Sequence, residues 1–143
     1  MPRKAKARML WGNISTSERV NQLSLKAALL FTWMIAHADD QGRMSGNPAT
    51  VKGIVCPMRD DITKADIVDL LREIEDKELI LIYPAYEQYL NWPIEDAIIQ
   101  IIDWWDYQAL REPKASKYAA HECWQDRIGR QTRDKNGRYV SSL

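Results

Sequence analysis

The stretch from Leu25 to Ala38 constrains the fold more than any other part of the sequence, because it is almost wholly apolar. Ser24 in front of it is a favourable N-cap residue, and the run is long enough for about four helical turns. A helix with almost no polar face has to lie at the centre of a domain. We therefore predict that this helix is the buried centre of the domain.

Cap residues and turn formers divide the rest of the sequence into short elements. Asn47 followed by Pro48 marks a helix start, and Thr63 with Asp66 three residues later fits a capping box. Two apolar, β-branched runs downstream have the composition of strands. The expected elements are a short helix ending near Leu23, a short strand at 43–45, helices at 49–55 and 64–77, and strands at 79–83 and 97–102.

The order of these elements is that of a winged helix, in which a β-hairpin follows a helix-turn-helix core. We therefore predict an α+β, mainly helical fold, namely a winged helix-turn-helix with a two-stranded β-hairpin wing and a basic C-terminal extension. Trp92 in the wing loop is a candidate contact residue, with packing as the equal alternative. The expected division is a basic N-terminal arm at 1–10, the winged-helix domain at 11–108 and a partly flexible extension at 109–143.

Charge is unevenly distributed along the chain, although its formal net charge is zero. Residues 1–20 carry five basic and one acidic side chain, and residues 109–143 carry eight basic and four acidic ones. Residues 39–108 carry fifteen acidic and six basic side chains. A polyanion would be attracted to the two ends alone, unless those ends are merely solvated tails.

The basic side chains at the two ends have the chemistry of a DNA-binding surface. Lys and Arg neutralise phosphates and release counterions, which gives affinity without sequence preference. Tyr118 or Trp124 among them could stack on an exposed base, although packing is the more frequent role of a lone aromatic such as Trp124. The candidate DNA-binding residues are Arg3, Lys4, Lys6, Arg8, Arg111, Lys114, Lys117, Arg127, Arg130 and Arg133.

Two stretches are similar to segments of winged-helix phage proteins that act as replication or replisome-organiser proteins. One runs from Leu23 to Phe31 and continues as Ala38-Asp39-Asp40-Gln41-Gly42-Arg43, and the other comprises Trp104, Tyr107-Gln108 and Lys114-Ala115-Ser116-Lys117-Tyr118. More distantly, the chain resembles the N-terminal domain of DnaD-type primosomal proteins, which self-associates. The resemblance implies a DNA-binding protein of phage or prophage DNA replication, a homo-oligomer such as a dimer, and contacts with other replication proteins.

Motifs for catalysis are missing from the sequence, which has no nucleophile elbow, phosphate-binding glycine loop or metal-spaced His or Cys set. Asp39-Asp40 and Asp60-Asp61 could hold Mg²⁺, but adjacent acids at turns and helix starts usually cap helices. We expect no catalytic residue, cofactor or metal. Without a membrane span or a secretory signal, the chain is expected to be soluble and cytoplasmic.

The helix expected at 64–77 has an acidic outward side, where a helix-turn-helix protein normally inserts its recognition helix into the major groove. Carboxylates there repel phosphates, so we expect this helix to stay out of the groove. The acidic side also favours an alternative function, a protein-protein interaction or oligomerisation adaptor without direct DNA contact. The acidic residues are Asp66, Asp69, Glu73 and Asp76, and the candidate interface aromatics, for which core packing is the alternative, are Trp11, Trp104 and Trp105.

Overall fold

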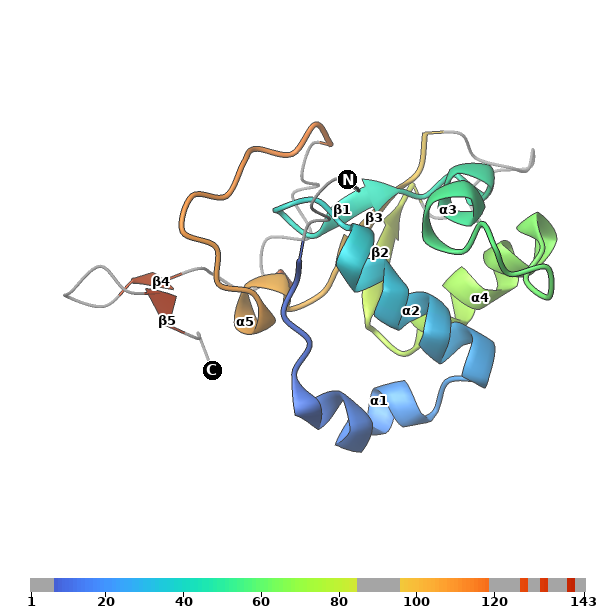
Figure 1. Cartoon of the computed structure of the whole chain (residues 1–143), viewed down its shortest axis with the longest axis horizontal. Coiled ribbons are helices and arrows are strands. Elements are labelled where there is room, and N and C mark those ends of the chain that lie inside the picture. Colours follow the sequence, from blue (N-terminus) through green and yellow to red (C-terminus); the bar gives the residue numbers. More distant parts are fainter. Residues whose placement is uncertain (1–6, 85–95, 119–126, 129–131, 134–138, 141–143) are drawn as a thin grey trace, which may run out of the picture.

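The computed structural model describes residues 7–84, 96–118, 127–128, 132–133 and 139–140. It is an α+β structure in which β1 (Arg43–Ser45), β2 (Ile80–Tyr83) and β3 (Ile98–Ile101) form one antiparallel sheet (Figure 1). A second, two-stranded sheet pairs β4 (Thr132–Arg133) with β5 (Tyr139–Val140). The helices are the 3-10 helix η1 (Gly12–Thr16) and the α-helices α1 (Glu18–Asn21), α2 (Leu25–His37), α3 (Pro48–Val55), α4 (Lys64–Asp76) and α5 (Trp104–Tyr107).

Helix α2 begins at the predicted cap and packs on the core along one side. Ser24 Oγ accepts a hydrogen bond from Ala27 N at 3.2 Å, which satisfies a backbone donor of the first turn. On the opposite side, Leu25 is 91% exposed and Trp33 is 38% exposed. The predicted helix is confirmed, but it is buried along one side and not all round. Its core side consists of Ala27, Leu30, Phe31 and Met34.

Helices α3 and α4 also begin at the predicted caps. Asn47 Oδ1 accepts from Ala49 N at 3.0 Å, immediately before Pro48 at the first helical position. Thr63 Oγ1 accepts from Asp66 N at 3.2 Å, and the Asp66 carboxylate accepts from Thr63 N at 2.9 Å. These reciprocal bonds are the capping box that the sequence predicts, and they hold the pKa of Asp66 below its usual value.

The three-stranded sheet is built on β3, with β1 and β2 at its two edges. The pairing of β2 with β3 confirms the predicted antiparallel partnership of the two apolar runs. In the other pairing, Met44 of β1 lies opposite Ile99 and Arg43 lies opposite Gln100. Since side chains alternate across a sheet, Met44 and Ile99 face the core, whereas Arg43 and Gln100 lie on the other face. The wing loop with Trp92 lies outside the described residues.

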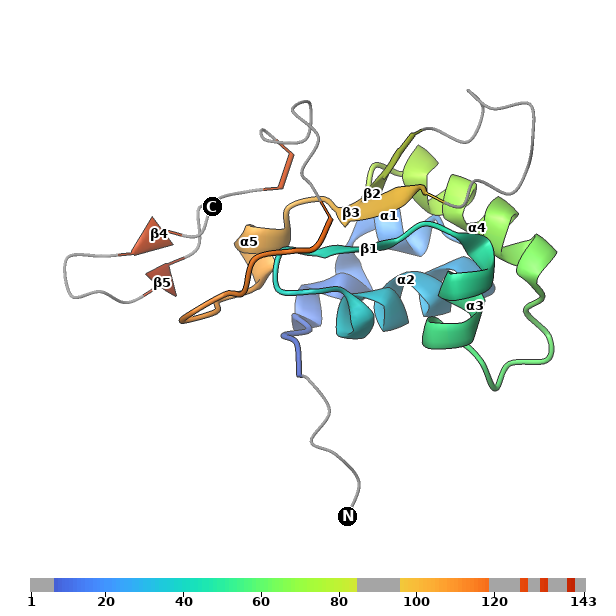
Figure 2. The same ribbon diagram turned by 90° about the horizontal axis from the view of Figure 1, so that it is seen from above.

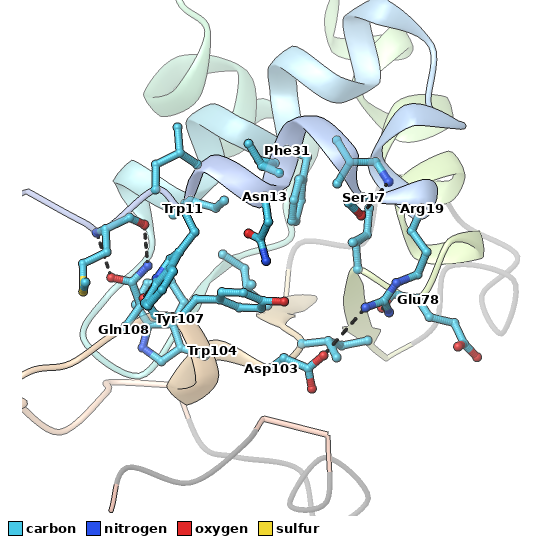
Figure 3. A pocket seen from close by; sticks show the side chains of 18 of the residues that line it. Trp11, Asn13, Ser17, Arg19, Phe31, Glu78, Asp103, Trp104, Tyr107 and Gln108 are labelled. Atoms are coloured by element: carbon cyan, nitrogen blue, oxygen red, sulfur yellow. Dashed lines mark hydrogen bonds and ion pairs between the residues drawn. The ribbon is translucent and has the colours of Figure 1, made fainter. Parts of the chain in front are cut away.

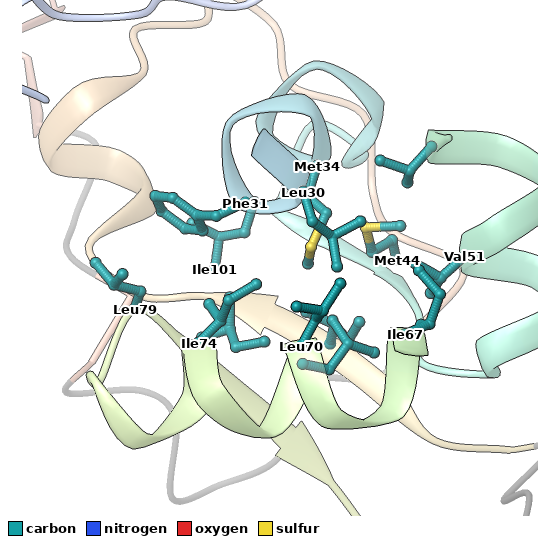
Figure 4. Packing of buried hydrophobic residues seen from close by; sticks show 14 of the residues in the cluster. Leu30, Phe31, Met34, Met44, Val51, Ile67, Leu70, Ile74, Leu79 and Ile101 are labelled. Atoms are coloured by element: carbon teal, nitrogen blue, oxygen red, sulfur yellow. The ribbon is translucent and has the colours of Figure 1, made fainter. Parts of the chain in front are cut away.

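Side chains from α2, α3, α4 and all three strands of the sheet meet in one core (Figure 4). Leu30 of α2, Val51 of α3 and Ile74 of α4 are each 0% exposed. Burying an aliphatic side chain of this size stabilises a fold by about 1.5–3 kcal/mol relative to leaving it exposed. Trp104 and Trp105 of α5 are also buried in this core, so core packing is the correct alternative for these two residues.

Two short stretches near the C-terminus were not anticipated in this form. Helix α5 follows β3, and the backbone at residues 127–128 lies beside it. Arg127 O accepts from Asp103 N at 2.7 Å, and Ile128 O accepts from Trp105 N at 3.0 Å. Residues 119–126, which include Trp124, lie outside the described residues.

None of the helices in the described ranges combines the length and the apolar composition needed to cross a bilayer.

Candidate nucleic-acid interface

A turn between α2 and β1 holds a basic stretch that lies more than seventy residues further along the chain. We call residues 39–42 the acidic turn and residues 111–118 the basic segment. Asp40 Oδ2 accepts a hydrogen bond from Lys114 N at 2.9 Å, and Gln41 Nε2 donates to Lys114 O at 3.1 Å. The Ser116 hydroxyl donates to Asp39 Oδ2, so both ends of this contact are fixed. The two lie side by side in both ribbon views (Figure 2).

Arg43 and Gln100, on the outer face of the sheet, complete the attachment. Arg43 Nη1 donates to Tyr118 O at 3.0 Å, and its Nε donates to Gln100 Oε1 at 2.7 Å. Gln100, which is 0% exposed, donates in turn to Gln41 O at 3.0 Å. Burial lowers the pKa of the Arg43 guanidinium, and the carboxylate of Asp39 opposes that shift. Since buried polar groups are costly without partners, this network fixes one arrangement of the turn and the segment.

Gly42 lets the acidic turn approach the core closely. Its φ of 79° lies in the left-handed region, and a Cβ at this position would stand 2.6 Å from Cδ2 of Trp104. The Trp104 indole also donates from Nε1 to Asp40 O at 2.9 Å. The turn is therefore seated on a buried tryptophan, which gives the basic segment a rigid support.

The structure brings three of the candidate DNA-binding residues together on the basic segment. Arg111, Lys114 and Lys117 are all exposed. The Lys117 ammonium lies 5.1 Å from the ring centroid of Tyr118, within the range of a cation–π contact. Arg127 lies elsewhere, 3.9 Å from Glu78 Oε2 in a solvent-exposed ion pair. Arg3, Lys4, Lys6 and Arg130 lie outside the described residues, as do the side-chain surroundings of Arg133.

Arg8 does not present its charge to solvent, in contrast to what its place in the basic arm predicts. Its side chain is 5% exposed and forms an ion pair with Asp40 Oδ1 at 2.8 Å. The same guanidinium donates to Ala38 O at 3.1 Å and lies 5.6 Å from the ring centroid of Trp104. A buried, paired arginine has no free face for a phosphate, so we leave Arg8 out of the proposed contact surface.

The acidic side of α4 consists of two kinds of carboxylate. Glu73 accepts from Ser24 N at 2.5 Å and from Ser24 Oγ at 3.0 Å, so it caps the start of α2. Asp66 belongs to the capping box. Asp69 and Asp76 are exposed on the same helix. The sequence shows the periodicity of this stripe, but the partner of Glu73 lies on another helix and could not be read from it.

A pocket of about 310 Å³ lies between η1, α1 and α5, and sequence reasoning missed it (Figure 3). Trp11, Phe31 and Tyr107 form much of its apolar wall. At one rim Trp11 Nε1 donates to Tyr107 O at 2.8 Å, and at another Arg19 lies 3.8 Å from Asp103 Oδ2. The pocket joins residues from both halves of the sequence, which explains why no local motif announces it.

Three of the four paired aspartates considered as metal ligands make other contacts. Asp39 and Asp40 accept the hydrogen bonds described above, and Asp61 forms an exposed ion pair with Arg59 at 2.6 Å. Within the described ranges, no three His, Cys, Asp or Glu side chains gather into a group that could hold a metal ion.

No protein-family model, curated protein or solved structure matches the chain.

Proposed function

We propose that the protein is a non-catalytic winged-helix protein of the cytoplasm that binds DNA through the basic segment. The observation that carries the proposal is the attachment of this segment to the acidic turn, which leaves Lys114 and Lys117 exposed on a fixed backbone. Cations held in place lose less conformational entropy on binding than cations on a free tail. Phosphate contacts of this kind give affinity without sequence preference.

Two features of the fold support the winged-helix part of the proposal. The element order from α2 to β3 is that of a helix-turn-helix core followed by paired strands. Strand β1 lies beside β3, so the short strand between the first two core helices belongs to the same sheet as the pair that would carry the wing. Helix α4 occupies the position of a recognition helix, but Asp69 and Asp76 disfavour its entry into the major groove.

A role in phage DNA replication is the more specific part of the proposal. Parts of the two sequence stretches that resemble phage replication proteins contact each other, namely 38–43 of the first and 114–118 of the second. Because the two stretches contact each other, there is a physical reason for both to be present in one sequence. Partners would then include other replication proteins.

A titration with labelled single-stranded and duplex oligonucleotides at two salt concentrations tests DNA binding. We expect retention at low salt and a log-log slope against salt of about −0.9 for each phosphate contacted on duplex. Binding to only one of the two oligonucleotides would show whether the protein prefers single-stranded or duplex DNA. A protein that retains neither form at low salt would refute the proposal.

A protein-interaction role is the second candidate, and the outward side of α2 favours it. Leu25 is 91% exposed and Trp33 38% exposed, and aromatic side chains are enriched in protein interfaces. We expect self-association that buries these two side chains. Light scattering should give the mass of a dimer or larger species at micromolar concentration. A monomer mass at high micromolar concentration contradicts self-association but leaves the proposed DNA binding unaffected.

A further inference from the structure

The carboxylate of Asp40 contacts two segments that lie far apart in the sequence. Its Oδ1 receives the Arg8 guanidinium at 2.8 Å, and its Oδ2 receives the backbone N–H of Lys114 at 2.9 Å. Hydrogen bonds to a charged group are about twice as strong as those between neutral groups. One side chain therefore connects the start of the chain to the basic segment.

Arg8 has the surroundings of a structural residue. Its guanidinium bonds to Asp40 and to Ala38 O, and Trp104 lies beneath it at 5.6 Å. Its Nε is buried without a hydrogen-bond partner among the described residues. An orphaned buried donor is costly, so the contacts of the outer guanidinium nitrogens have to offset that cost.

The backbone next to Arg8 is held from a second side. Met9 N donates to Gln108 Oε1 at 3.0 Å, and Gln108 Nε2 donates to Met9 O at 2.8 Å. Gln108 is 5% exposed and directly precedes the stretch that leads into the basic segment. Arg8 is thus placed by Gln108 on one side and by the acidic turn on the other.

From this geometry we infer that Arg8 and Asp40 are positioning residues for the basic segment. Arg8 fixes the orientation of the Asp40 carboxylate, and that carboxylate fixes the backbone at Lys114. The effect of this positioning on DNA affinity rests on the proposed function, since it can be measured only if the segment binds DNA. The positive charge of Arg8 acts through Asp40, without touching a phosphate.

The variants Arg8→Met and Asp40→Asn separate this role from direct phosphate contact, because the two explanations predict opposite signs for Asp40. If Arg8 contacts phosphate, loss of the negative charge at Asp40 raises the affinity for DNA. If the pair positions the segment, each variant lowers the affinity for a labelled duplex by about threefold, because fewer molecules hold the segment in place. The double variant then binds no more weakly than the weaker single variant.

Asp69→Asn is the matched control for charge. It makes the same charge change as Asp40→Asn at an exposed position on α4, so DNA affinity should stay unchanged or rise. Arg8→Lys keeps the charge but not the planar geometry of the guanidinium, and we expect an affinity between those of wild type and Arg8→Met. It also replaces Arg8→Met in the comparison if the methionine variant does not fold.

Hydrogen exchange of the Lys114 amide, measured without DNA, tests the contact independently of binding. We expect exchange to be about tenfold faster in Asp40→Asn and accelerated in Arg8→Met, with the amides of the α4 core unchanged. Raised DNA affinity in Asp40→Asn, or unchanged Lys114 exchange in Arg8→Met, would overturn the positioning role. If the wild type binds no DNA, the proposed function fails, and the exchange rates still decide whether the contact positions the segment.

Discussion

Alanine at both Lys114 and Lys117 is expected to lower the affinity for duplex DNA by on the order of tenfold or more at about 0.1 M salt. Both side chains are exposed on a backbone that the acidic turn fixes, so their removal takes charge from the proposed surface without disturbing the core. The slope of log affinity against log salt should become shallower by about 1.8 if each lysine contacts one phosphate. Fluorescence anisotropy with a labelled duplex over a series of salt concentrations measures both quantities.

The control for this pair is the double variant Asp69→Ala and Asp76→Ala on α4. It changes charge by the same magnitude with opposite sign, and we expect its DNA affinity to be unchanged or higher. Glu73 is kept out of the control because it caps α2, and its loss would disturb the start of that helix. Should the two aspartates prove necessary for binding in a folded protein, the DNA surface lies on α4 and not on the basic segment.

Replacement of Gly42 by alanine is expected to destabilise the fold by about 2–4 kcal/mol, from left-handed backbone strain together with overpacking. Its φ is 79°, and the new methyl group would stand 2.6 Å from the Trp104 ring. Either the ring or the turn has to move, and the turn supports both Asp40 and the basic segment. Urea denaturation of the two proteins measures the difference in the free energy of unfolding.

Gly53 supplies the matched glycine control. It lies in α3, and a Cβ built there meets nothing within 4 Å. Gly53→Ala should therefore stabilise the protein by up to about 1 kcal/mol, as in an exposed helix interior. If Gly42→Ala and Gly53→Ala changed the free energy of unfolding equally, the close approach of Gly42 to Trp104 would not matter for stability.

Local signals explain why the sequence predicted most of the helices and strands. Caps at Ser24, Asn47 and Thr63 act within three residues, and each makes the expected bond. The pairing of β2 with β3 follows from two apolar runs that have no other partner of their kind. The place of β1 beside β3 could not be predicted, because a strand of three residues carries too little pattern.

The sequence identified the basic residues of the candidate site. It could not show which of them are neutralised by a carboxylate. A basic side chain is visible in a sequence, but the carboxylate that neutralises it is not, since the partner of Arg8 is thirty-two residues away. For the same reason the sequence could not separate Lys114, which is exposed, from Arg8, which is buried. The network of Arg43 and Gln100 joins residues fifty-seven positions apart and has no local signature.

The basic segment determines the charge of the surface that it forms with the acidic turn. While the segment lies over the acidic turn, its lysines are outermost and the carboxylates of Asp39 and Asp40 are occupied beneath it. If the segment were cut away or peeled back, the Oδ2 atoms of Asp39 and Asp40 would lose their donors, while Asp40 Oδ1 would keep its ion pair with Arg8. The lysines would be lost from this patch, and the two carboxylates beneath would be balanced by the guanidinium groups of Arg8 and Arg43, so the patch would no longer attract a polyanion. Loss of a few residues of backbone would therefore remove the positive charge of this surface altogether, and not merely reduce it.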